Sequence, residues 1–359
     1  MKLAAWCIGI LAFLWMPQLN ASVTVLLEEP YGYDGAFGGV GHVAVYLNRV
    51  CAASSSSLRR CDEGEYGVVI SRYDGLAVTI GLPFRCSLIF NAVTKPEDIP
   101  AYADDDIVAS LRDHYRHQHL QEIAADDPLG RAPGGNWVQL VGSSYNRTTF
   151  TYQLETAVQQ DDELIGWLNG RPNRPLYRVV TRNCADFVRD VINFYYPKAV
   201  SRAIVADFGV TTPKRVASSL SKYSRRHTDL EFVSRVIPQV PGTIRRSKPI
   251  HGMAESVFKA KKYMIPLAFF QPYVAGAFAA AYLVEGRFKT DRKATISNLE
   301  AVESPLAGDE HSAHPGGVNA LSLSIEASAV KPVGKWGLLL FPEQLRTGAS
   351  NGQCDPTRD

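Results

Sequence analysis

The sequence predicts an α+β fold in which an antiparallel sheet packs against a helix that begins with a cysteine. Two short runs, residues 42–50 and 65–73, are rich in Val and aromatic residues, which is typical of the strands of a hairpin. Much later, the apolar side chains of residues 184–195 recur at the spacing of one helix face. With 359 residues, 46% of them hydrophobic, the chain can bury a core in one large domain or two smaller ones.

The other elements follow from periodicity and from turn residues. Residues 22–29 have strand character, and a Gly-rich loop at 30–41 connects them to the hairpin. Beyond the hairpin we expect a helix within 104–120, a strand at 148–154, a helix at 156–170, the cysteine helix, and a short helix after Pro213. The region 92–170 is longer than a compact domain needs, so it could form a cap that shapes substrate access.

Charge and motifs restrict the classes of partner. The chain has 38 Lys and Arg against 36 Asp and Glu, a formal charge of +2, which gives no electrostatic reason to expect a nucleic-acid partner. The sequence contains no internal repeat, phosphate-binding loop or paired Cys-x-x-Cys metal motif. We therefore expect neither a nucleic-acid partner nor a cofactor.

The first residues indicate export. Lys2 precedes an apolar run at 3–15, Pro17 interrupts that run, and small residues stand at 20–22 where a signal peptidase could cut. We expect a signal peptide at 1–21 and a periplasmic or cell-envelope location. The alternative is an uncleaved N-terminal anchor, which leaves the rest of the chain on the same side of the membrane.

The cysteine count predicts at least one free thiol. Of six cysteines, five remain once the leader has been removed, and an odd number cannot all pair in an oxidising compartment. Cys51 and Cys61 bracket a small polar loop, and a disulfide between them would contribute roughly 2–3 kcal/mol. Two unpaired buried thiols are the alternative. Cys184 has no candidate partner near it in the sequence.

Cys184 and His42 are the candidate catalytic residues. Asn183 is a suitable N-cap, which places Cys184 in the first turn of a helix, where unpaired N–H groups and the helix dipole favour a thiolate. Among the eight histidines, His42 begins an apolar strand directly after the Gly-rich loop, so the strand can hold its ring rigidly. The competing interpretations are a structural first-turn cysteine and an ordinary edge histidine.

Together these two motifs resemble a known family. The run from Gly41 to Leu47, followed much later by Asn183-Cys184 and an aromatic–aliphatic pair at 187–188, is similar to the circularly permuted branch of the NlpC-type papain-like thiol hydrolases. That branch includes the lecithin retinol acyltransferase-like proteins. In it the histidine strand precedes the cysteine helix, and the resemblance covers about residues 22–200.

The resemblance implies a permuted papain-like domain at 22–222 and a definite chemistry. Cys184 would attack a carbonyl carbon and His42 would accept the thiol proton, giving an acyl-enzyme that water or another acceptor resolves. A third polar group usually orients the histidine from the next strand. This chain offers Ser71 or Glu65 for that role.

The C-terminal third has a different character. Residues 223–290 are expected to form a basic linker and an apolar helical segment, and residues 291–359 a largely disordered tail. The segment 263–284 is almost entirely apolar, is long enough to span a bilayer, and has cationic residues beyond both ends. Pro266 and Pro272 weaken a straight helix, so membrane insertion, peripheral membrane contact and a buried helix or helical hairpin all remain open.

The sequence thus favours an exported cysteine hydrolase or acyltransferase that acts on an amide or ester. Its substrate would be a peptide crosslink of a cell wall or an acyl lipid. A catalytically silent, membrane-associated binding or assembly module with the same fold is the alternative.

Overall fold

The computed structural model describes residues 21–31, 40–54, 56–72, 87–121, 124–132, 138, 140–171, 177–290 and 295–296. The chain divides into two units, Met1–Glu310 and His311–Asp359, and every described residue belongs to the first unit. The predicted leader, apart from Ala21, and almost all of the predicted tail lie outside the described residues.

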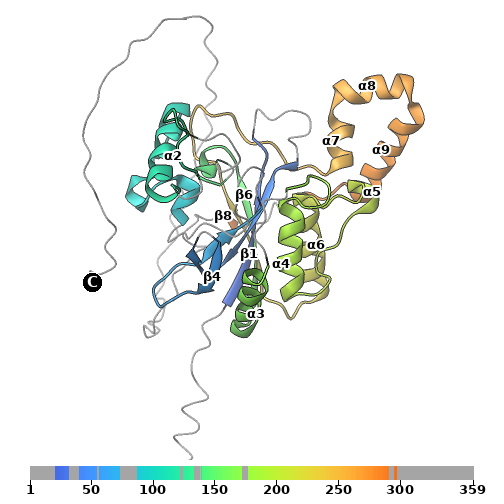
Figure 1. Cartoon of the computed structure of the whole chain (residues 1–359). Coiled ribbons are helices and arrows are strands. Elements are labelled where there is room, and N and C mark those ends of the chain that lie inside the picture. Colours follow the sequence, from blue (N-terminus) through green and yellow to red (C-terminus); the bar gives the residue numbers. More distant parts are fainter. Residues whose placement is uncertain are drawn as a thin grey trace, which may run out of the picture. The chain divides into compact units, whose positions relative to one another are not determined.

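A six-stranded sheet organises the described structure (Figure 1). Its strand order is β5-β2-β1-β6-β7-β8, and all neighbouring pairs are antiparallel except β7 and β8. The strands are β1 (Ala21–Glu28), β2 (His42–Leu47), β5 (Val68–Ile70), β6 (Thr149–Thr156), β7 (Phe232–Ile237) and β8 (Thr295–Ile296). The prediction of an α+β fold with an antiparallel sheet is confirmed.

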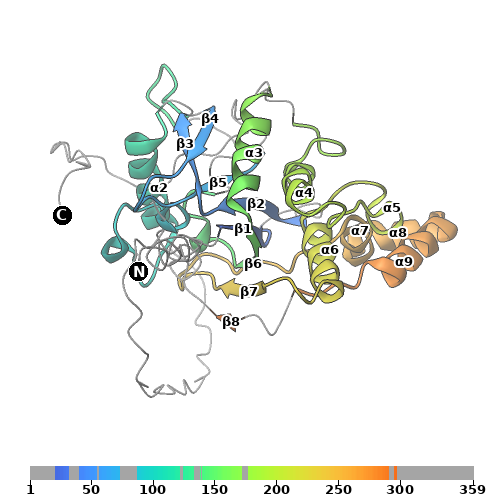
Figure 2. The same ribbon diagram turned by 90° about the horizontal axis from the view of Figure 1, so that it is seen from below.

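Both faces of this sheet are covered, because its strands are apolar on both sides. In β2, Val43, Val45 and Leu47 face one core, while Ala44 and Tyr46 face another. Alternate residues of a strand point to opposite faces, so this division is the period-two pattern of a sheet buried on both sides. The helices α3, α4 and α6 cover the first face, and α2 and its neighbouring turns cover the second (Figure 2).

Two of the covering helices begin at residues whose side chains cap the helix start. Asp104 caps α2, and Thr212 caps α6, which has Pro213 at its first position. These elements are α2 (Asp105–His119), α3 (Val158–Asn169), α4 (Cys184–Tyr195), α5 (Ile204–Asp207) and α6 (Pro213–Arg226). Both β6 and α3 lie within 92–170, the segment expected to form a cap, and they belong to the sheet and to a core layer. This half of the segment is therefore an integral part of the domain.

A second, two-stranded sheet carries the predicted disulfide. It consists of β3 (Val50–Ser54) and β4 (Ser57–Arg60), inserted between the paired strands β2 and β5. Cys51 and Cys61 are bonded at the open end of this hairpin, while Cys184 is a free thiol. The prediction of a bridge between Cys51 and Cys61 and of a free Cys184 is confirmed.

The apolar segment 263–284 is divided between two helices. These are α8 (Lys261–Phe270) and α9 (Pro272–Glu285), which follow α7 (Met253–Lys259). Because proline cannot donate a backbone hydrogen bond, Pro272 starts a new helix and Gln271 forms the break. Among the described residues, no helix has both the length and the apolar character needed to cross a bilayer. The helical hairpin is thus the arrangement observed, and α8 contains no buried residue.

Candidate active site

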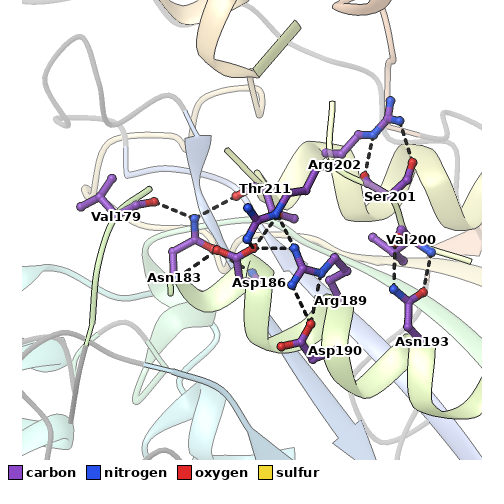
Figure 3. Close-up of polar contacts among 11 residues, drawn as sticks. Val179, Asn183, Asp186, Arg189, Asp190, Asn193, Val200, Ser201, Arg202 and Thr211 are labelled. Atoms are coloured by element: carbon purple, nitrogen blue, oxygen red, sulfur yellow. Dashed lines mark hydrogen bonds and ion pairs between the residues drawn. The ribbon is translucent and has the colours of Figure 1, made fainter. Parts of the chain in front are cut away.

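Cys184 is the first residue of α4, as the sequence predicts, and Asn183 fixes the start of that helix. The Asn183 side chain accepts a hydrogen bond from the N–H of Asp186 at 2.8 Å. Its amide group donates to the carbonyl oxygens of Val179 and Thr211 at 2.8 and 2.9 Å (Figure 3). One side chain therefore ties the helix start to the segment before it and to the loop before α6, which holds Cys184 in a defined position.

Asp186 completes this arrangement from inside the helix. Its carboxylate accepts from the Asn183 N–H, which makes the cap reciprocal. The same carboxylate accepts from Arg189 and Arg202, both at 2.8 Å, and from the Thr211 hydroxyl at 2.6 Å (Figure 3). This role of Asp186 was not predicted, although the Asn-x-x-Asp spacing at the start of the helix is a signal for a reciprocal cap.

Burial determines the ionisation of Cys184. Its side chain is 5% exposed and packs in the core between α4 and β2. Burial raises the pKa of the thiol to about 11, and hydrogen bonds from the backbone N–H groups of Val43 and Ala185 offset only part of this rise. The helix start was expected to favour a thiolate. In the folded protein the loss of water is the larger effect, so the resting sulfur keeps its proton.

Gly41 delivers His42 to its position at the start of β2. Gly41 has φ of 66°, in the left-handed region that favours glycine. A Cβ atom at this position would overlap the carbonyl oxygen of Glu28 on the neighbouring strand. The close approach of the two backbones here explains why a glycine precedes the histidine.

Ser71 is the polar group that the structure brings to the imidazole. Its Oγ lies 3.1 Å from Nε2 of His42 and donates to the carbonyl oxygen of Val43 at 2.8 Å. Because the single hydroxyl proton goes to Val43, Oγ accepts from an Nε2–H, and the lone pair of the neutral ring is on Nδ1. The other candidate, Glu65, instead forms two 2.7 Å bonds with Arg59.

His42 is neutral in its resting environment. Burial lowers the pKa of its imidazole, and the cation of Arg147 lowers it further, to about 3. At neutral pH the site therefore contains a protonated thiol and an uncharged imidazole. The pair is not a pre-formed thiolate and imidazolium.

A buried ion pair lies beside the histidine and was not predicted. Glu28 is opposite His42 in the register of β1 and β2, and it pairs with Arg147 at 3.2 Å; both side chains are almost fully buried. Burial raises the pKa of Glu28 to about 7 against the opposing effect of Arg147. The guanidinium also lies 3.8 Å from the ring centroid of Tyr31, a cation–π contact. Glu28 and Arg147 are far apart in the sequence, so no local sequence pattern could predict this ion pair.

The Cys184 thiol and the His42 imidazole are both linked to Val43. The Val43 backbone lowers the pKa of the Cys184 thiol, and the Val43 carbonyl accepts from Ser71, which in turn contacts His42. Alternation places the His42 side chain on the face of Glu28, whereas Val43 faces α4. Strand β5 ends at Ile70, opposite Val45, and Ser71 follows it with contacts to Val43 and His42.

Among the other histidines that the structure describes, none belongs to a group with metal-like spacing. His117 pairs with Asp113 and Asp126 on the surface of the domain. One group of described side chains, Cys51, Cys61 and Glu65, has metal-like spacing, but its two sulfurs are joined in the disulfide.

With this geometry established, known proteins offer no assignment. No protein-family model matches the chain, and neither a curated protein nor a solved structure matches it significantly. The function must therefore be argued from the site.

Proposed function

We propose that this protein is an exported thiol hydrolase or acyltransferase with a permuted papain-like domain of the lecithin retinol acyltransferase-like kind. Cys184 is the nucleophile and His42 the general base. One observation carries the proposal. A free thiol at the start of a helix and an imidazole held by Ser71 are both linked to the backbone of Val43. The order of the elements, with the histidine strand before the cysteine helix, agrees with a permuted domain.

The resting protonation states determine how the chemistry proceeds. Nδ1 of His42 takes the thiol proton as the sulfur of Cys184 attacks the carbonyl carbon, and we expect the two atoms to lie within roughly 3–5 Å. The carbonyl oxygen gains the negative charge, and backbone N–H groups at the start of α4 are suited to stabilise it once the sulfur has bonded to the carbonyl carbon. The imidazolium then protonates the leaving amine or alkoxide, and water or a second acceptor releases the acyl group from sulfur.

The substrate class follows from this chemistry. An attacking thiol that forms an acyl-enzyme needs an amide or an ester, and in a cell envelope the candidates are a peptide crosslink and an acyl lipid. Turnover of peptidoglycan fragments and of acylated phospholipids by the wild type and by Cys184→Ser tests the proposal. A hydroxyl there is far less ionised than a thiol, so we expect the variant to fold and to lose activity. Wild-type turnover by Cys184→Ser would refute it.

Burial of the site favours a second candidate, a catalytically silent binding module with the same fold. A thiol with its pKa raised to about 11 and a histidine with its pKa lowered to about 3 are also what an inert core pair would show. The two candidates differ in reactivity. In an enzyme, Cys184 reacts with a thiol-directed acyl probe at neutral pH faster than a free thiol does. In a silent module, Cys184 reacts with the same probe more slowly than a free thiol.

A further inference from the structure

The break between α8 and α9 presents large apolar side chains to solvent. Phe269 and Phe270 are 80% and 81% exposed, and Tyr273, just beyond the break, is 91% exposed. Exposed aromatic residues grouped in this way, hereafter the hairpin tip, are costly in water and mark a surface that contacts another apolar phase. Neither the thiol nor the imidazole of the proposed active site is part of this group.

The charge around the hairpin tip is of one sign. No Asp or Glu occurs between residues 256 and 284, whereas Lys259, Lys261 and Lys262 precede the tip. At the base of the hairpin, a cavity of about 650 Å³ is lined by several cationic side chains, including Arg287 and Lys289, and by fewer acidic ones. This distribution attracts an anionic surface and repels a second copy of the same hairpin.

The lengths of the helices limit how deep the tip can go. At 1.5 Å per residue, the 10 residues of α8 extend about 15 Å and the 14 residues of α9 about 21 Å. The hydrocarbon core of a bilayer is about 30 Å thick, so the hairpin reaches into one leaflet. With the tip buried, Lys261 and Lys262 at the start of α8 lie at the level of lipid phosphates, where long cationic side chains are stabilised.

The base of the hairpin is fixed to the domain, which keeps the tip projected. Lys214 of α6 pairs with Glu255 and donates to the carbonyl oxygen of Gly286 at 2.8 Å. The rings of Phe258 and Tyr282 stack with their centroids 5.2 Å apart, joining α7 to α9. A hairpin anchored in this way orients the whole domain on whatever surface binds its tip.

From these features we infer that the hairpin tip docks the protein onto the surface of an anionic phospholipid bilayer. Its aromatic side chains enter one leaflet, and Lys261 and Lys262 contact the lipid phosphates. This inference does not depend on the catalytic proposal, because none of its residues touches Cys184 or His42.

Vesicle co-sedimentation of the full chain tests the inference. Vesicles of phosphatidylglycerol mixed with phosphatidylcholine should bind the wild type more tightly than pure phosphatidylcholine does, and added salt should remove the difference. Phe269→Ser/Phe270→Ser should weaken binding to both vesicles by at least about tenfold. The matched control, Tyr102→Ser/Leu129→Ser, removes two exposed apolar side chains elsewhere and should bind as the wild type does.

A charge variant separates the two contributions. Lys261→Gln/Lys262→Gln should weaken binding to the anionic vesicles by about tenfold or more and leave binding to pure phosphatidylcholine unchanged. The inference is overturned if the wild type sediments with neither vesicle, or if the double Phe variant binds as well as the control. It is also overturned if the wild type is an oligomer in lipid-free buffer that the double Phe variant dissociates, because the tip would then bind another copy.

Discussion

Replacing the buried Asn183 with alanine should destabilise the start of the cysteine helix, because several hydrogen bonds depend on this one side chain. The side chain makes three hydrogen bonds, one as the cap of α4 and two to carbonyl oxygens of separate segments. Loss of an N-cap costs about 1 kcal/mol, and each lost bond to a buried carbonyl about 0.5–1.5 kcal/mol. We therefore expect Asn183→Ala to lower the free energy of unfolding by about 2–4 kcal/mol, or the Tm by about 5–15 °C.

Two variants make this prediction specific. Asn183→Ser keeps a cap acceptor but removes both amide donors, so its loss of stability should be smaller than that of Asn183→Ala. Asn193→Ala, near the other end of α4, is the control, because it removes two hydrogen bonds to the Val200 backbone, at 2.8 and 2.9 Å, without touching the cap. Hydrogen exchange at the Asp186 amide should accelerate in Asn183→Ala, which has no cap acceptor, and not in Asn193→Ala. A Tm loss below about 2 °C for Asn183→Ala, or exchange at Asp186 as fast in Asn193→Ala, would refute the reasoning.

Three further predictions concern the surroundings of the site. Gly41→Ala should lower the free energy of unfolding by roughly 2 kcal/mol or more in denaturant titration. Gly64→Ala, also at positive φ but in open space, should lower it by about 1 kcal/mol. Equal losses would contradict a clash between the new Cβ atom and the Glu28 carbonyl oxygen. Arg147→Met should lower the free energy of unfolding by about 3–5 kcal/mol, and the loss should be larger at pH 8 than at pH 5. Burial raises the pKa of Glu28 to about 7, so at pH 5 its carboxyl group is protonated and is not stabilised by the guanidinium charge. A loss of stability that is the same at both pH values would contradict this. Reduction of the disulfide in the β3–β4 hairpin should lower the free energy of unfolding by about 2–3 kcal/mol without changing the state of the free thiol, as unfolding curves and mass spectrometry would show.

Local patterns predicted the parts of the fold that depend on neighbours in the chain. The strand β2, the N-cap of Asn183 and the bridge between Cys51 and Cys61 follow from spacing and residue type, and the structure contains all three. The choice of Ser71 over Glu65 did not follow, because both occur near the same strand. Only the packed structure shows that the first reaches His42 while the second pairs with an arginine.

Long-range burial accounts for what the sequence could not predict. A helix start favours a thiolate, but the Cys184 thiol is also enclosed by β2, whose contribution depends on how distant segments pack. The pairing of Glu28 with Arg147 likewise joins positions 119 residues apart. The direction of the Cys184 pKa shift is therefore a property of the fold and not of the motif.

The pH dependence of Cys184 acylation in the wild type and in His42→Gln tests the central claim most directly. The measurement is the rate of reaction with a thiol-directed acyl probe, in protein whose fold is verified by circular dichroism. If His42 is the base, the wild type should react at least about 100-fold faster near pH 7. The difference should narrow as the pH approaches 11, where the thiol ionises without help. Equal rates for the two proteins across this range would contradict the account and leave Cys184 as a core residue.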